Sequence, residues 1–221
     1  MLFSFIIEMI GALACAISGI RLAALRRFDW FGAYIVGLVT ALGGGTLRDA
    51  ILCQPAFWVA DLRFFLAYFL VTALALAIVV VFSRQLVRRE RMLLVFDAVG
   101  LAMFTVIGIE KALARDCPMC IAITMGMLTG AFGGVLRDVL LNRVPLIFRK
   151  DIYAMASLLG GVCYWIARWS GGSPEICAVS CLAVIVTVRM LAVRYSWHLP
   201  VLSPSEHDAE ADTDNPSFPS R

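Results

Sequence analysis

Long apolar blocks, separated by short polar segments, dominate the sequence. Seven blocks are long enough for helices that cross a bilayer, since about 20 residues span about 30 Å of hydrocarbon. Residues 64–82 are continuously apolar, whereas a strand of a membrane barrel would alternate apolar and polar residues over about ten positions. The pattern therefore predicts an all-α integral membrane protein. The predicted spans are residues 3–20, 30–52, 64–82, 93–113, 118–141, 151–169 and 174–193.

Composition supports this class. Hydrophobic residues make up 61% of the 221 residues and charged residues only 16%, a balance outside the range of water-soluble domains. The first block lacks the basic start of a signal peptide, and Glu8 interrupts it, so we expect it to be retained as a span. Residues 1–200 are predicted to form the membrane domain. Residues 201–221 are acidic and poor in large apolar residues, which predicts a disordered cytoplasmic tail.

The positions of lysine and arginine predict the orientation. Basic residues gather on one side of the predicted spans, and the positive-inside rule assigns that side to the cytoplasm. The N-terminus is then outside and the C-terminus inside. The net charge of +3 reports topology rather than nucleic-acid binding. The basic residues on the predicted inner side are Arg21, Arg26, Arg27, Arg84, Arg88, Arg89, Arg91, Arg143, Arg149, Lys150, Arg189 and Arg194, against Arg63, Lys111, Arg115 and Arg168 outside.

One motif occurs twice, as GGTLRDAIL from Gly44 and as GGVLRDVLL from Gly133. The offset is 89 residues, and further glycines align at the same offset, which indicates an internal duplication. Each copy holds three spans, so the second copy enters the membrane from the opposite face. Such inverted repeats carry their site near the midplane, where broken helices of both halves meet. The fold class is therefore seven transmembrane helices as an inverted 3+3 repeat plus one: repeat one about 3–82, repeat two about 93–169, and the seventh helix about 174–193.

Small residues recur at every fourth position in the second and fifth spans. With 3.6 residues per turn they line one face, where two helix backbones can approach closely. For Gly37 and Gly126, tight packing is the preferred interpretation.

Consecutive glycines in the same two spans predict a kink or break. Each glycine costs about 1 kcal/mol of helix stability, and three neighbours point in three directions, so packing alone does not explain them. A break frees carbonyl groups, which persist at that depth only when buried or lining a watery cavity, and the negative end of a half-helix favours a cation. The predicted polar constriction comprises Thr40, Gly43, Gly44 and Gly45 in one span and Thr129, Gly133 and Gly134 in the other.

Charged side chains also interrupt the spans. A charge near the bilayer centre costs at least a few kcal/mol, so such residues face the bundle interior and usually pair. We expect two symmetry-related ion pairs, Glu8 with Arg48 and Asp97 with Arg137, which either anchor the helices or act in gating. Lys111 either snorkels to the outer interface or turns into the pathway. The predicted intramembrane charges are Glu8, Arg48, Asp49, Asp97, Lys111, Arg137 and Asp138.

The sequence offers no candidate catalytic or metal site. Its two histidines, His198 and His207, lie at the edge of the tail, and it contains no phosphate-binding loop and no nucleophile with a base. Cys117 and Cys120 have a redox-like spacing without the βαβ pattern of a thioredoxin. An enzyme is therefore disfavoured, and we expect no cofactor.

The doubled GGxLRD motif, the three-plus-three arrangement and the outside N-terminus resemble the prokaryotic trimeric intracellular cation (TRIC) channels, over residues 3–195. The resemblance implies a homotrimer in the inner membrane, with a pore in each protomer that passes K⁺ and Na⁺ and is shaped by the glycine kinks. Besides the other protomers and the permeating cations, we expect bound membrane lipid as a partner. Phe132 stands where the first copy has Gly43, so we expect it either to weaken the second bend or to plug or gate the path. Glu110 and Lys111 reverse the order found in eukaryotic relatives, so their lipid-regulatory role is not carried over.

Two alternatives stay open. Bacterial relatives are also described as glycine transporters, and a small zwitterion suits a midplane site with half-helix ends of both signs. A scaffold without flux is the third hypothesis.

Overall fold

The structure is a computed structural model that describes residues 2–82, 90–149 and 152–195, and within these ranges it contains helices and no strand. The all-α class is confirmed. The predicted tail, 201–221, and the basic residues at 84, 88, 89 and 150 lie outside the described residues. The long helices are α1 (Leu2–Leu25), α2 (Trp30–Ile51), α4 (Leu62–Val81), α6 (Glu90–Leu113), α7 (Met119–Leu140), α9 (Ile152–Trp169) and α10 (Pro174–Tyr195), and the short ones are α3 (Phe57–Ala60) and α8 (Leu146–Arg149).

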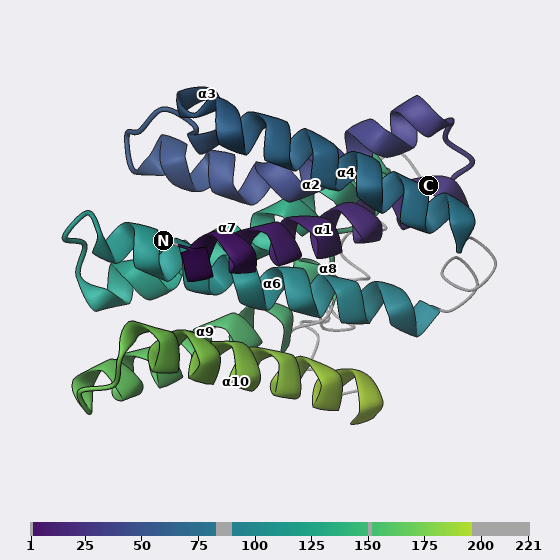
Figure 1. The fold of residues 1–221 in the computed structure, drawn as a ribbon. Helices are drawn as coiled ribbons and strands as arrows, with labels where there is room; N and C mark the ends of the chain where they lie inside the picture. Colours follow the sequence, from purple (N-terminus) through teal and green to yellow (C-terminus); the bar gives the residue numbers. More distant parts are fainter. Residues whose placement is uncertain (1, 83–89, 150–151, 196–221) are drawn as a thin grey trace, which may run out of the picture.

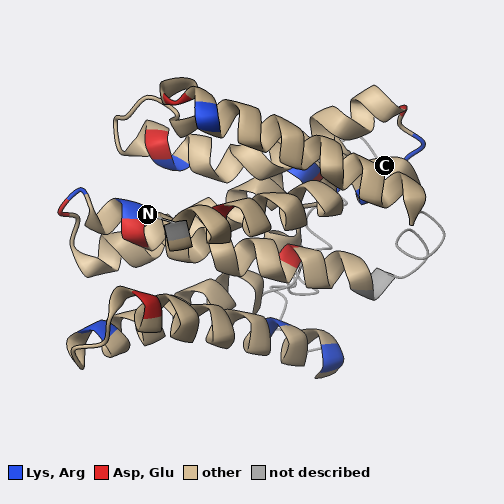
Figure 2. Cartoon of the chain, viewed as in Figure 1, with Lys and Arg blue, Asp and Glu red and all other residues tan. Residues whose placement is uncertain are grey.

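The long helices lie side by side in one bundle (Figure 1). Helix α1 contacts α2 and α4, and α6 contacts α7, α9 and α10. The contacts of α1 with α6 and of α2 with α7 join the first three long helices to the next three. Charged residues lie mainly near the helix ends, with a few bands within the helices (Figure 2).

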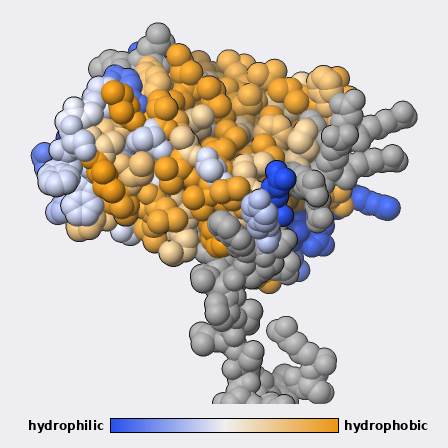
Figure 3. Space-filling model, turned by 90° about the horizontal axis from the view of Figure 1, so that it is seen from below, coloured by the Kyte–Doolittle hydropathy of each residue, from blue (hydrophilic) through white to orange (hydrophobic). Residues whose placement is uncertain are grey.

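Six helices in the described part of the chain are long and apolar enough to cross a membrane. The predicted span 151–169 is the helix α9, which is not among these six because it carries tyrosines, tryptophans, glycines and Arg168. The first helix extends to Leu25, beyond the predicted end at residue 20. Hydrophobic side chains cover most of the face seen in Figure 3, as expected for a surface in contact with lipid. The chain is therefore a multi-pass membrane protein.

The ends of the helices repeat at the offset of 89 residues. Arg27 and Asp116 have φ of 60° and 56°, and Cys53 and Asn142 have φ of 52° and 50°. Each follows a long helix in a left-handed cap, in which the next N–H bonds back to a carbonyl five residues earlier. Equivalent positions in the two halves therefore end their helices in the same way.

The small residues of α2 and α7 allow close packing, as the ladder pattern predicts. A Cβ on Gly37 would lie 2.6 Å from Ile20 in α1, and a Cβ on Gly126 would lie 2.6 Å from Ile109 in α6. Both contacts occur at the same offset of 89 residues.

Candidate functional site

Helices α2 and α7 cross at their glycine segments. A Cβ on Gly44 would overlap the carbonyl oxygen of Thr129, and a Cβ on Gly133 would overlap that of Thr40. The two contacts are reciprocal, since Gly44 and Gly133 are equivalent in the two copies, as are Thr40 and Thr129. Only glycine allows two helix backbones to approach so closely.

Of the predicted kink or break, the break is wrong, while the kink stays a prediction. Both α2 and α7 continue as α-helix through their glycines, and the carbonyls of Thr40 and Thr129 are covered by the opposite helix. The hydroxyls of these threonines donate to the carbonyls of Val36 and Met125, both at 2.6 Å, and both side chains are buried. The physical reason is that close helix contact offsets the low helix propensity of glycine, so the segment need not unwind.

The other glycine positions have different neighbours. A Cβ on Gly43 would lie 2.5 Å from Leu136, and one on Gly45 would lie 2.6 Å from the ring of Phe57. Phe132 lies in an apolar groove of about 440 Å³ between α2 and α7, which Trp58 and Leu136 also line. The structure thus places Phe132 in this groove rather than among the buried charges.

The first charge centre consists of Glu8, Arg48, Asp49 and Tyr68, from α1, α2 and α4. Arg48 Nη2 lies 2.7 Å from Asp49 Oδ1, and Arg48 Nε donates to the same oxygen at 2.8 Å. Tyr68 Oη donates to Glu8 Oε1 at 3.1 Å. All four side chains are buried.

The second charge centre consists of Asp97, Arg137, Asp138, Tyr153 and Arg189, from α6, α7, α9 and α10. Arg137 Nη1 donates to Asp97 Oδ1 at 2.7 Å, and Arg137 Nε donates to Asp138 Oδ1 at 2.9 Å. The guanidinium of Arg189 lies over the ring of Tyr153, 4.6 Å from its centroid. All five side chains are buried.

One of the two predicted ion pairs is present. Asp97 and Arg137 pair as expected. Glu8 and Arg48 do not pair in the described structure: Arg48 pairs with its neighbour Asp49, and Glu8 accepts from Tyr68 instead. The physical reason is that Tyr68 supplies a donor from α4, while Asp49 supplies the counter-charge of Arg48 within its own helix.

The Arg-Asp dipeptide of the repeated motif holds the chain that follows each crossing helix. Asp49 Oδ2 accepts from the backbone N–H of Phe57 at 2.8 Å, and Asp138 Oδ2 accepts from that of Leu146 at 3.1 Å. These N–H groups open the short helices α3 and α8. The motif therefore anchors each short helix with a carboxylate eight residues earlier, which an arginine neutralises.

Several residues of these centres were missed by sequence reasoning. Ser18 of α1 accepts from Arg137 Nη1 at 2.5 Å, and Tyr68 and Tyr153 have no motif that marks them. Arg189 has a signal in the sequence, because it interrupts the apolar block 174–193, although the positive-inside pattern also accounts for a basic residue there. In the structure it is 1% exposed.

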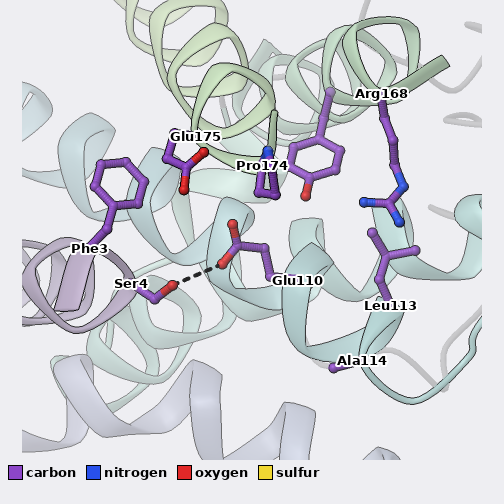
Figure 4. Close-up of a pocket in the computed structure, with 9 residues that line it drawn as sticks. Phe3, Ser4, Glu110, Leu113, Ala114, Arg168, Pro174 and Glu175 are labelled. Atoms are coloured by element: carbon purple, nitrogen blue, oxygen red, sulfur yellow. Dashed lines mark hydrogen bonds between the residues drawn. The ribbon is translucent and has the colours of Figure 1, made fainter. Parts of the chain in front are cut away.

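Lys111 is exposed at the end of α6, and both of its predicted roles stay predictions. Its neighbour Glu110 lines a pocket of about 400 Å³ where α1 begins, α6 ends and α10 begins (Figure 4). Ser4 Oγ donates weakly to Glu110 there, at 3.4 Å. Cys117 and Cys120 are free thiols near the start of α7, so no disulfide joins them.

Comparisons with known proteins find relatives that match most of the chain. The family model described as Glycine transporter matches residues 5–85 and 94–169, two segments that begin 89 residues apart. The UPF0126 inner membrane protein YadS of Escherichia coli is 38% identical over 203 residues, which cover 91% of this chain and 97% of that protein. The UPF0126 membrane protein YvgT of Bacillus subtilis is 33% identical over 198 residues, covering 88% and 94%.

Solved structures match over similar lengths. A TRIC trimeric intracellular cation channel orthologue from Rhodobacter sphaeroides is 32% identical, with a TM-score of 0.82, and the match covers 89% of this chain and 100% of that chain. A second TRIC cation channel structure is 30% identical, with a TM-score of 0.79 and coverage of 90% and 97%. The chain therefore belongs to the family of the prokaryotic TRIC channels and UPF0126 membrane proteins.

Proposed function

We propose that this protein is a passive channel for the monovalent cations K⁺ and Na⁺, with a pore in each protomer. The observation that carries the proposal is the match to the whole length of a solved TRIC channel at 32% identity. The solved relatives are channels rather than enzymes, which favours flux over catalysis.

The two charge centres support a cation route. Glu8 and Asp97 are equivalent carboxylates of the two halves and are 5% and 4% exposed. A carboxylate at the depth of the hydrocarbon region lowers the energy of a cation that enters this region of the membrane. The glycine segments, where the two halves approach most closely, would shape the path.

We infer that the two halves are inverted copies and that all seven long helices span the membrane. The reciprocal contacts of Gly44 and Gly133 are what a two-fold axis in the membrane plane produces. Helix α9 can span despite its composition, because its glycines pack on Ile185 and Ile123 rather than on lipid. The N-terminus is then outside and the C-terminus cytoplasmic.

We further propose a homotrimer with membrane lipid between protomers. The Rhodobacter relative is described as trimeric. The apolar groove that holds Phe132 offers a surface for a neighbouring protomer or an acyl chain. Light scattering of the purified protein should give a protein mass about three times the 24.2 kDa of one chain.

The channel is tested with purified protein in a planar bilayer under a KCl gradient. Single-channel currents that reverse near the K⁺ equilibrium potential support the proposal. Mixed KCl and NaCl solutions then give the preference between the two ions. Silent bilayers would contradict a channel.

The family description makes glycine transport the second candidate. The same preparation in liposomes distinguishes it, because a transporter accelerates counterflow of labelled glycine while a channel does not. Silent bilayers together with saturable glycine counterflow would assign the transporter. If the protein shows neither current nor glycine counterflow, the scaffold hypothesis is the one that remains.

A further inference from the structure

The second charge centre contains buried polar atoms that lack hydrogen-bond partners. Asp97 Oδ2 is one, and Nε and Nη2 of Arg189 are two more. Arg189 Nη2 lies 4.0 Å from Asp97 Oδ2, which is too far for a hydrogen bond. The carboxylate oxygen and the guanidinium edge therefore face each other as a long ion pair, with no hydrogen bond across the gap.

Both groups are held in place by other contacts. Arg137 Nη1 fixes Asp97 through Oδ1 at 2.7 Å, so Oδ2 stays directed into the gap. The ring of Tyr153 supports the Arg189 guanidinium at 4.6 Å, a favourable cation–π distance. The unpartnered atoms therefore belong to side chains with defined positions. A buried carboxylate oxygen without a partner is costly, so it favours a polar ligand.

Gly134 lies beside this polar cluster. The three atoms nearest to a Cβ on Gly134 would all be polar: the Tyr153 hydroxyl at a tight 3.3 Å, Asp97 Oδ1 at 3.5 Å and Arg137 Nη2 at 3.6 Å. At the equivalent glycine of the first half, Gly45, the ring of Phe57 occupies this place. Among the three nearest neighbours of these two glycines, oxygen atoms therefore occur only in the second half.

The two centres also differ in their source of positive charge. Arg189 comes from α10, which follows the two matched halves of the chain, so it has no equivalent in the first centre. Glu8, the equivalent of Asp97, receives a tyrosine hydroxyl instead of a second arginine.

We propose that Asp97 Oδ2 binds a permeating monovalent cation and that Arg189 is its tethered competitor. This inference rests on the proposed channel function. A cation that reaches Asp97 gains a carboxylate oxygen without breaking a hydrogen bond to Arg189. Arg137 and Arg189 flank the same carboxylate, so the local positive charge opposes a divalent ion about twice as strongly as a monovalent one. The ligand class is therefore a monovalent cation that oxygen atoms coordinate, K⁺ or Na⁺.

The test is Arg189→Gln, which removes the competing charge and keeps a polar side chain. We expect the K⁺ concentration for half-maximal single-channel conductance to fall about threefold or more, because a unit charge close to a buried carboxylate has been removed. Arg189→Lys should restore a value close to wild type. Arg194→Gln, the same charge change at an exposed position of α10, is the matched control and should leave it unchanged. An Arg189→Gln value equal to that of Arg194→Gln would overturn the proposal.

Ion binding is also measured without current. Melting temperatures of the purified protein in KCl are compared with those in choline chloride at equal ionic strength, since a ligand of the folded state stabilises it. We expect Arg189→Gln to increase the K⁺-dependent shift and Asp97→Asn to abolish it. Where Asp97→Asn fails to fold, Arg189→Gln alone decides.

The two measurements distinguish the two ideas. Channel currents with no change in Arg189→Gln would refute the site and keep the channel. A K⁺-dependent shift that grows in Arg189→Gln, from a protein that passes no current, would keep the site and refute the channel.

Discussion

Gly44 and Thr129 lie in direct backbone contact where α2 crosses α7, and the equivalent residues Gly133 and Thr40 repeat the contact. The repeated motif therefore serves two ends. Its glycines bring the two halves together, and its Arg-Asp pairs, one turn further on, anchor the helices that follow.

Gly133→Ala is expected to destabilise the protein by about 1–3 kcal/mol or more, because the new methyl group overlaps the carbonyl of Thr40. The matched control is the neighbouring Gly134→Ala. A methyl group there meets its nearest atom at 3.3 Å, and alanine raises the helix propensity. The melting temperature in detergent should fall clearly for the first variant and little for the second. Equal melting temperatures would show that the crossing tolerates a side chain.

Asp49→Asn is expected to cost about 3–5 kcal/mol, because it removes the carboxylate that pairs with the buried guanidinium of Arg48. Arg48→Met combined with Asp49→Asn should recover part of this loss. The asparagine oxygen can still accept from the N–H of Phe57, and the buried guanidinium is no longer present. Urea or thermal unfolding of both variants measures the recovery. A double variant as unstable as the single one would show that the ion pair itself is needed.

Asp61 is the control for that change, because it also caps a helix and contacts an arginine. Its carboxylate accepts from the backbone N–H of Arg63 and from the Arg63 side chain at the exposed start of α4. The side-chain hydrogen bond from Arg63, followed by that from its backbone, lowers the pKa of Asp61. Any stabilisation is therefore present above the ordinary aspartate pKa and is lost as the pH falls through the lowered value. Asp61→Asn should have a small effect at neutral pH.

Tyr68→Phe should destabilise the protein by about 1.5–3 kcal/mol, because it removes the hydrogen bond to the Glu8 carboxylate. Glu8→Gln should be tolerated better, since the amide oxygen can still accept from the tyrosine. Reversal of Glu8 and Arg48 together should not restore expression, because the two residues do not pair. If the double reversal rescued expression, Glu8 and Arg48 would pair after all, as the sequence alone predicts.

The apolar pattern alone predicts the long helices, because burial in lipid requires long continuous apolar blocks whatever the tertiary contacts. The duplication is equally visible, since equivalent positions must solve the same packing problem. Gly37 and Gly126 follow directly from it. The helices, the duplication and these glycine contacts all follow from patterns that repeat along the chain, and such patterns are visible in a single sequence.

Two features could not be predicted from the sequence, for a physical reason: the close helix crossing at the glycine segments and the hydrogen-bond partner of Glu8. A run of glycines suits both a break and a close crossing, and only the position of the opposite helix decides between them. An arginine can reach the next residue as easily as another helix, so spacing does not identify its partner. The contribution of Arg189 was also hidden, because a basic residue near a helix end matches the topology rule.

The accessibility of cysteines tests the inverted arrangement. Cys53, at the end of α2, and Cys120, near the start of α7, are both exposed, and the proposed orientation puts both outside. An impermeant maleimide should therefore label wild-type protein in spheroplasts with the outer face of the inner membrane exposed, and labelling should be lost when Cys53, Cys117 and Cys120 are replaced by serine. Phe28→Cys in that variant adds an exposed thiol at the opposite end of the bundle.

We expect the thiol at position 28 to react only after the membrane is permeabilised. Labelling of this variant, but not of the wild type, in sealed spheroplasts would reverse the orientation and keep the inverted halves. Labelling of both from the same side would mean that the loop between α1 and α2 and the end of α2 share one face of the membrane. Helix α2 could then not span the membrane. The two-fold axis through its crossing with α7 could then not lie in the plane of the bilayer, and the inverted arrangement would be refuted.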